Sequence, residues 1–244
     1  HTEYLGDDLA EITTEKGGVI KEGQTVITAA TKSEVKNKLT EIAAEKNADL
    51  INVYDYFFWE KKESAQIEQK IDVNGLRGYY NNLKLPLLGE YQIINTATAI
   101  AVVEVLYSNY PVAPEIIKEG ISKVQWPGRL EVVAKSPMII LDGAHNQSGA
   151  QKLRVELENL EYERLIMVLS ILGDKDYQGI IEQLVPIVDE LILTQNRNPR
   201  AAKVEDLYKC VQNYRVSVRR EKNLKRAVDD AISEAGEKDL ILIG

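Results

Sequence analysis

The regular alternation of strand-like and helix-like segments after residue 126 constrains the fold of this chain more than any other sequence feature. Short apolar runs lie near 130–134, 138–142, 164–170, 190–194, 215–218 and 239–243, and helical patterns separate most of them, near 147–159, 177–185, 203–213 and 222–235. Repeated strand–helix units predict a mostly parallel sheet with helices on both faces. We therefore predict a Rossmann-like α/β domain over residues 127–244.

The first half of the chain has a more mixed pattern. Helical spacing occurs over 7–16 and over 33–46, and Ser33 is the expected N-cap of the second helix. Strand-like runs at 24–30 and 49–53 lie on either side of that second helix, which predicts one βαβ step. Residues 54–88 alternate apolar and polar side chains, so we expect antiparallel strands with turns at Asn74-Gly75 and Asn81-Asn82. Two further helices are predicted over 90–108 and 113–123. The Pro127-Gly128 pair interrupts the pattern, and we place a domain boundary there.

Charge and composition exclude several classes of protein. The formal net charge of −8 argues against a nucleic-acid partner, because phosphate binding needs a basic surface. No apolar run approaches the roughly 20 residues of a membrane span, so we expect no membrane partner. Cys210 is the only cysteine, which rules out an internal disulfide and favours a cytoplasmic location. Since the sequence starts at His1 and stops at Gly244 after an apolar strand, we expect a fragment of a longer protein.

The segment from Asp142 to Asn146 is the first candidate for a functional site. It follows the strand-like run 138–141, and ligands of open α/β sheets bind at the carboxyl ends of strands. Asp142 can accept hydrogen bonds from a ribose, while His145 can contact a phosphate or orient a carboxylate. The start of the next helix favours anions. Spacing alone leaves a second interpretation equally open, in which Asp142 and Asn146 only cap that helix.

Six motifs in order carry a more specific signal. They are His1-Thr-Glu-Tyr-Leu-Gly6 with Glu15-Lys16-Gly-Gly18, Pro86-Leu-Leu-Gly-Glu-Tyr-Gln-Ile-Ile-Asn95, Trp126-Pro-Gly-Arg129-Leu-Glu131, Asp142-Gly-Ala-His-Asn146, Ser170-Ile-Leu-Gly-Asp-Lys-Asp176 and Asn198-Pro-Arg-Ala201. Together they resemble the folylpolyglutamate synthase/dihydrofolate synthase family of the Mur ligase superfamily. The resemblance covers essentially the whole chain. It implies that residues 1–126 are the remainder of a central ATPase domain and that residues 127–244 are the C-terminal glutamate ligase domain.

The resemblance also implies a reaction and its participants. Such enzymes use ATP and Mg²⁺ to join a folate or dihydropteroate carboxylate to L-glutamate through an acyl phosphate. By position, His1 matches a Mg²⁺ ligand, and Lys16 matches a catalytic lysine that holds a second metal ion when carbamylated. Asn95, Arg129 and Asp142 match ATP-binding residues, with Arg129 on the γ-phosphate. His145 matches a catalytic residue near the glutamate, and Lys175 and Arg200 match contacts to that amino acid.

The sequence departs from the family pattern in three places. Gly17 replaces an alanine, Gln147 replaces a proline, and no Gly-x-x-x-x-Gly-Lys phosphate loop occurs in the 244 residues. We therefore expect the 244 residues by themselves to be inactive. Two alternatives stay open: another Mur-type amino-acid ligase of the peptidoglycan or cyanophycin-synthetase kind, and a non-catalytic nucleotide-binding module. We expect the parent enzyme to be a monomer with small-molecule partners.

Overall fold

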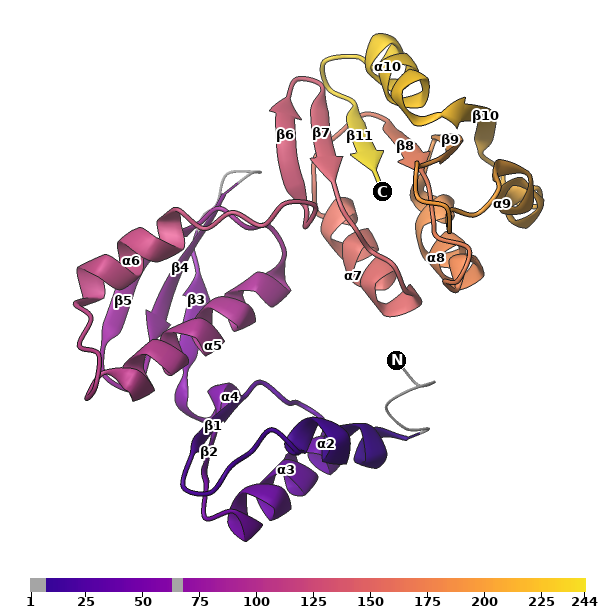
Figure 1. The fold of residues 1–244 in the computed structure, drawn as a ribbon. Coiled ribbons are helices and arrows are strands. Elements are labelled where there is room, and N and C mark those ends of the chain that lie inside the picture. The colour runs from indigo at the N-terminus through magenta and orange to yellow at the C-terminus, as the bar shows by residue number, and fades with distance from the viewer. Residues whose placement is uncertain (1–7, 63–67) are drawn as a thin grey trace. The chain divides into compact units, whose positions relative to one another are not determined.

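The computed structural model describes residues 8–62 and 68–244, which form two compact units (Figure 1). The first unit holds most of the chain up to Val124. The second consists of Gln125–Gly244 with two short earlier segments, one of which is Pro86–Gly89. No helix in the described ranges is long and apolar enough to cross a bilayer.

The first unit begins with the predicted βαβ step. The elements are α2 (Leu9–Gly17), β1 (Thr25–Thr28), α3 (Ser33–Glu45), β2 (Asp49–Asn52) and the single turn α4 (Val53–Tyr56). Strands β1 and β2 pair in parallel, which confirms this step. The prediction for Ser33 is wrong. Lys32 is the N-cap, with an extended backbone and no side-chain cap bond, so Ser33 already lies inside the helix.

An antiparallel sheet follows, made of β3 (Phe58–Lys61), β4 (Gln69–Asn74) and β5 (Tyr79–Leu85). The predicted turn at Asn74-Gly75 is confirmed, since the Gly75 N–H donates to the Gly78 carbonyl at 2.8 Å. The predicted turn at Asn81-Asn82 is wrong because both residues lie inside β5. The strand register shifts at this point, and Asn82 takes a left-handed backbone with φ of 51°. Asparagine tolerates this conformation and is common in both bulges and turns, which is why the residue type alone suggested a turn here.

Two helices, α5 (Glu90–Leu106) and α6 (Pro114–Ser122), complete the first unit. One buried carboxylate of α5 fixes the turn between β4 and β5. Glu104 is 2% exposed, and it accepts hydrogen bonds from the N–H groups of Leu76 at 2.7 Å and Arg77 at 3.0 Å. The Tyr80 hydroxyl donates a third bond at 2.9 Å. Burial, and secondly this bond to Glu104, raises the pKa of the Tyr80 hydroxyl.

The second unit contains the predicted alternation of strands and helices. Its elements are β6 (Glu131–Lys135), β7 (Met138–Leu141), α7 (Gln147–Glu158), β8 (Leu165–Leu169), α8 (Tyr177–Leu184), the 3₁₀ turn η1 (Val185–Ile187), β9 (Glu190–Gln195), α9 (Val204–Val211), β10 (Ser217–Asn223), α10 (Leu224–Glu234) and β11 (Leu240–Ile243). They form a six-stranded sheet in the order β10-β9-β8-β11-β7-β6. Only the edge strand β6 runs antiparallel to its neighbour. The predicted Rossmann-like, mostly parallel fold is therefore confirmed.

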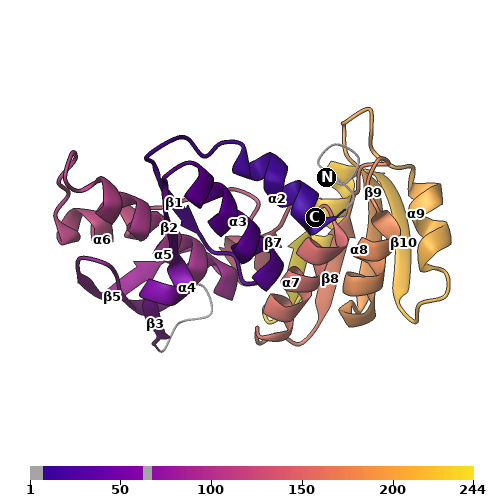
Figure 2. The same cartoon turned by 90° about the horizontal axis from the view of Figure 1, so that it is seen from below.

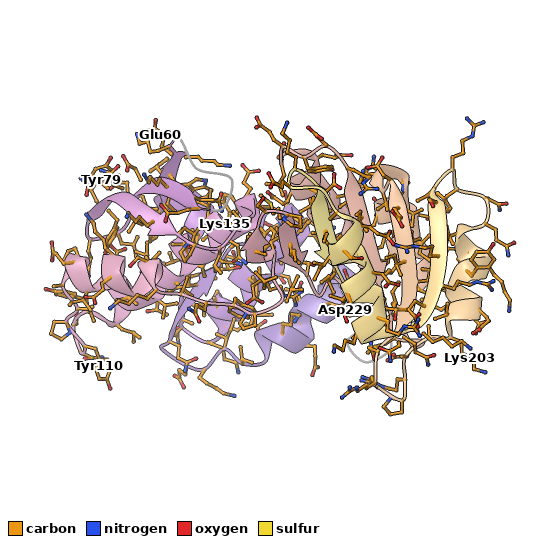
Figure 3. All side chains as sticks on the ribbon, turned by 90° about the horizontal axis from the view of Figure 1, so that it is seen from above. Glu60, Tyr79, Tyr110, Lys135, Lys203 and Asp229 are labelled. Carbon is orange, nitrogen blue, oxygen red and sulfur yellow. The ribbon has the colours of Figure 1, made fainter. Side chains whose placement is uncertain are left out.

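Helices cover both faces of this sheet, with α10 on one side and α7 and α8 on the other (Figures 1 and 2). All five residues of β8 are buried, as expected for a central strand of a covered parallel sheet. Ile166 and Val168 pack against Ala227 and Ala231 of α10. Figure 3, seen from above, shows α10 across the sheet with the exposed Asp229 on it. Because helices cover both faces of the sheet, the loops that can form a binding site lie at the carboxyl ends of the strands.

Candidate functional site

Asp142 lies where β7 ends and joins two loops. The residue is only 8% exposed. Its Oδ1 accepts a hydrogen bond from the Ala144 N–H at 2.8 Å, and its Oδ2 accepts one from the Leu130 N–H at 2.9 Å. Burial raises the pKa of the Asp142 carboxyl, while these two bonds and the charge of Arg129 oppose the rise. The carboxylate thus ties the loop after β7 to the turn that precedes β6.

Arg129 and His145 converge on the backbone of Gly143. Arg129 donates from Nη1 to the Gly143 carbonyl at 3.2 Å, and Nδ1 of His145 lies 3.1 Å from the same oxygen. The bond requires a proton on Nδ1, so in a neutral His145 ring Nε2 is an acceptor. The structure therefore gathers Arg129, Asp142 and His145 at one loop, as their assignment to a common site requires.

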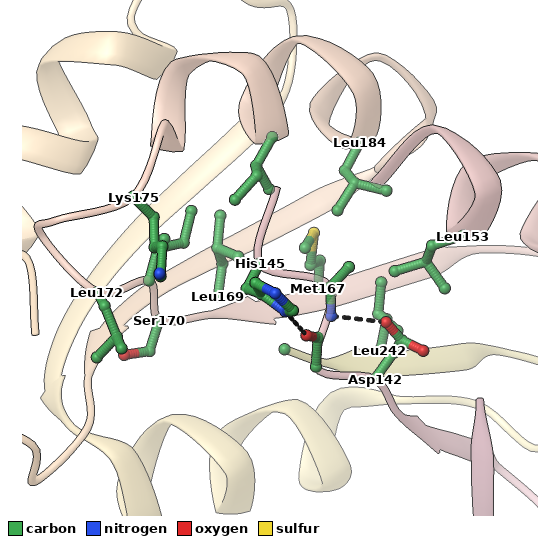
Figure 4. Close-up of a pocket in the computed structure, with 15 residues that line it drawn as sticks. Asp142, His145, Leu153, Met167, Leu169, Ser170, Leu172, Lys175, Leu184 and Leu242 are labelled. Atoms are coloured by element: carbon green, nitrogen blue, oxygen red, sulfur yellow. Dashed lines mark hydrogen bonds between the residues drawn. The ribbon is translucent and has the colours of Figure 1, made fainter. Parts of the chain in front are cut away.

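A small cavity of about 130 Å³ lies beside this loop. Its polar lining includes Asp142, His145 and Lys175, and its remaining wall is largely apolar, with Leu153, Met167, Leu169, Ile180, Leu184 and Leu242. In Figure 4, Lys175 and Leu172 lie at one end of the lining and Leu153 and Leu184 at the other. The volume is below the roughly 300 Å³ of typical ligand pockets. This volume suits a small ligand or part of a larger one.

The loops after β8 and β9 bring Lys175 and Arg200 close to a common carboxylate. Arg200 donates from Nη1 to Asp174 at 3.0 Å, and the Lys175 ammonium lies 3.9 Å from the same Oδ2 atom. The Gly173 N–H also donates to the Arg200 carbonyl at 2.7 Å. Lys175 lines the cavity, whereas Arg200 is not part of its lining. Both cations keep N–H donors that Asp174 does not use, so each can also contact an anionic ligand.

Asn146 and Asp142 differ in their relation to α7. The Asn146 side chain caps the helix by accepting from the Gly149 N–H at 2.8 Å. The capping interpretation is therefore correct for Asn146. It does not apply to Asp142, whose bonds go to Leu130 and Ala144, outside the helix.

We expect Asn146→Ala to lower the free energy of unfolding by about 1 kcal/mol, because the Gly149 N–H loses its acceptor. Asn146→Asp keeps a side-chain oxygen at that place and should stay within about 0.5 kcal/mol of the wild type. Urea unfolding followed by circular dichroism measures both variants. Equal stability of the alanine variant and the wild type would show that the cap contributes nothing.

Two other predicted residues, Lys16 and Asn95, are described within the first unit. Lys16 is exposed in the last turn of α2, and Asn95 is exposed on α5, where its Nδ2 donates to Gln92 at 2.9 Å. His1 lies outside the described residues. The roles of all three stay predictions.

The described residues by themselves contain no cluster of metal-binding side chains. Across 8–62 and 68–244, no three His, Cys, Asp or Glu side chains gather closely enough to hold a metal ion. Lys16 as an ammonium has no lone pair to offer. Its predicted metal role therefore depends on carbamylation, and we derive no chemical step through a metal ion.

Sequence analysis gave no role to two residues that shape this site. Glu131 accepts a hydrogen bond from the Gly128 N–H at 2.8 Å, and Ser170 Oγ accepts one from the Asn196 N–H at 2.9 Å. Both residues occur in the motifs quoted above, but their partners lie on turns whose path the sequence does not reveal. Only their positions within these motifs indicated that the two residues could belong to a functional site.

Comparison with known proteins first defines the class. Residues 128–244 match the family described as Mur ligase, glutamate ligase domain. Over 96% of its length, the chain is 33% identical to dihydrofolate synthase/folylpolyglutamate synthase of Mycobacterium tuberculosis, covering 50% of that protein. The Bacillus subtilis protein of the same name is 30% identical over the whole chain, which covers 57% of it.

Solved structures agree with these relatives. Mycobacterium tuberculosis folylpolyglutamate synthase complexed with ADP and AMPPCP matches with a TM-score of 0.86 and 31% identity, over 100% of this chain and 58% of that one. E. coli FolC in complex with DHPP and ADP matches with a TM-score of 0.84 and 27% identity, over 100% and 55%. The chain belongs to the folylpolyglutamate synthase/dihydrofolate synthase family of Mur ligases. It spans about half the length of the curated relatives it matches.

Proposed function

We propose that this chain is part of an ATP-dependent ligase that forms an amide between a folate or dihydropteroate carboxylate and L-glutamate. The convergence of Arg129, Asp142 and His145 on one loop, beside a cavity with Lys175, supports this proposal most directly. The nucleotide complexes of the related structures support ATP as the co-substrate. The DHPP complex of E. coli FolC supports an acceptor of that kind.

The proposed chemistry follows from the charges involved. A carboxylate is a poor electrophile because its negative charge repels nucleophiles. Transfer of the γ-phosphoryl group from ATP, which leaves ADP, removes this charge and installs a leaving group. The amine of glutamate then attacks the acyl carbon, the amide bond forms, and inorganic phosphate and a proton are released. The planar guanidinium of Arg129 suits the γ-phosphate oxygens, where negative charge develops. Asn95 is the second proposed nucleotide contact, and Asp142 the third, since each of its oxygens keeps a lone pair.

We assign the cavity to the incoming glutamate. Lys175 and Arg200 supply positive charge for its carboxylates, and His145 lines the same cavity, where it can orient the amine or the phosphoryl group. The small cavity volume favours an amino acid over a whole nucleotide. Lys16 and His1 remain proposed metal-binding residues.

The proposed domains are 1–126 for the remainder of the ATPase domain and 127–244 for the glutamate ligase domain. The first compact unit ends at Val124, and the family match begins at residue 128. Both observations support this boundary. We also propose that the enzyme is monomeric and cytoplasmic, with no nucleic-acid or membrane partner.

A glutamate-incorporation assay of the full-length enzyme tests the function. With ATP, we expect labelled L-glutamate to be added to dihydropteroate or a folate, and not to UDP-linked muropeptides. Lys175→Ala should raise the KM for glutamate roughly 10- to 100-fold and leave the KM for ATP nearly unchanged, because a charged hydrogen bond contributes about 1.5–3 kcal/mol.

Lys203→Ala is the matched control, since Lys203 is exposed at the start of α9 and makes no side-chain cap bond. It should retain wild-type constants. Transfer to muropeptides but not to folates would replace the proposal with the other Mur-type ligase. No transfer to any acceptor, with nucleotide binding intact, would favour the non-catalytic module.

A further inference from the structure

The turn that carries Arg129 has an unusual backbone. Gly128 and Leu130, on either side of Arg129, both take left-handed conformations, with φ of 68° and 46°. Positive φ is uncommon for residues other than glycine, and Leu130 is also buried at 3% exposure. Such a conformation persists only where neighbouring groups hold it in place.

Two carboxylates hold the backbone on both sides of Arg129. Glu131 accepts from the Gly128 N–H at 2.8 Å, and Asp142 accepts from the Leu130 N–H at 2.9 Å. Hydrogen bonds to an ionised acceptor are stronger than neutral ones. The Gly143 N–H donates to the Gly128 carbonyl at 2.8 Å, so this turn is also fastened to the loop that bears His145.

Neither carboxylate neutralises the guanidinium in an ion pair. The hydrogen bond of the Arg129 side chain goes to the Gly143 carbonyl, whereas Glu131 and Asp142 accept from backbone N–H groups. A guanidinium has five N–H donors, so most of them stay available for a ligand. Glu131 and Asp142 therefore hold the backbone on both sides of Arg129, while its guanidinium stays available to bind an anion.

We propose that Glu131 is a positioning residue for Arg129, acting together with Asp142 from the other side of the turn. This inference rests on the proposed function, in which Arg129 contacts the γ-phosphate of ATP. Glu131 itself touches the Gly128 backbone and not the nucleotide. A shift of the turn by even 1 Å would move the guanidinium away from the phosphoryl group.

Binding of AMPPCP and of ADP to the full-length enzyme, measured by titration calorimetry, tests this role. Glu131→Ala should weaken AMPPCP binding about tenfold. It should leave ADP binding within about twofold, because ADP lacks the γ-phosphate that Arg129 holds. Glu131→Gln should restore most of the loss, since its amide oxygen can accept from the Gly128 N–H.

A double-mutant cycle and a matched control separate positioning from general stabilisation. In an Arg129→Ala background, Glu131→Ala should cause no further loss of AMPPCP affinity. Asp189 is the control because it too accepts a backbone bond, from the Leu165 N–H at 2.8 Å. Asp189→Ala should lower the thermal midpoint and leave the AMPPCP-to-ADP affinity ratio unchanged.

Three results would overturn the inference. Equal losses for AMPPCP and ADP would show that Glu131 only stabilises the domain. Unchanged AMPPCP binding by Glu131→Ala, with Arg129→Ala impaired, would remove the positioning role and leave the proposed function intact. Unchanged AMPPCP binding by Arg129→Ala would remove the γ-phosphate contact, and the positioning role with it.

Discussion

Arg129→Ala is expected to lower the kcat of the full-length ligase by roughly 10²-fold or more, because it removes a cation from the place where phosphoryl charge develops. The effect on the KM for glutamate should be small. Arg129→Lys should recover part of the rate, since it restores the charge but not the planar fork that binds two oxygens at once. Steady-state glutamate incorporation at saturating ATP measures all three enzymes.

Arg226→Ala provides the comparison for this experiment. Arg226 is an exposed arginine on α10 of the same unit, with Glu221 at 3.6 Å as its partner. Its loss should leave kcat within about twofold, because an exposed ion pair contributes little. An Arg129→Ala enzyme with wild-type kcat would contradict the placement of Arg129 at the reacting phosphate.

Glu104→Ala is expected to lower the free energy of unfolding by about 3 kcal/mol. The substitution removes one buried acceptor from three donors, namely the N–H groups of Leu76 and Arg77 and the hydroxyl of Tyr80. The Tyr80 hydroxyl, which is buried, then loses a charged partner in a site that water reaches poorly, and the two N–H groups lose theirs in a partly buried turn. Urea unfolding of the full chain, followed by circular dichroism, measures the change.

Glu119→Ala is the control for this prediction. Glu119 forms an exposed ion pair with Lys123 on α6 of the same unit, so its loss should change stability by less than about 0.5 kcal/mol. Gly75→Ala should reproduce the Glu104 defect by another route, because an added Cβ would lie 2.6 Å from the Glu104 carboxylate. A Glu104→Ala loss below about 1 kcal/mol would mean that the three bonds have little net value.

The sequence alone determined the local structure of the second unit and predicted three residues of the candidate site. Strand and helix positions after residue 126 agree with the structure within two residues, since apolar periodicity reflects local burial, except that β10 ends at Asn223, five residues beyond the predicted run 215–218. Short motifs identified Arg129, Asp142 and His145 because their residue types and order are specific. The presence of a mostly parallel sheet followed from the alternation itself.

Only the tertiary structure decided features that depend on contacts distant in the sequence. Strand order, with β11 between β7 and β8, comes from pairing across more than seventy positions of chain. Asn82 lies in a β-bulge and not in a turn, and its N–H donates to the Asp72 carboxylate, ten residues earlier. Asp142 holds the Leu130 backbone from 12 positions away, and Glu104 closes a turn 27 and 28 residues away. Local periodicity cannot encode such pairings, because they are fixed by which buried donors and acceptors meet once the chain has folded.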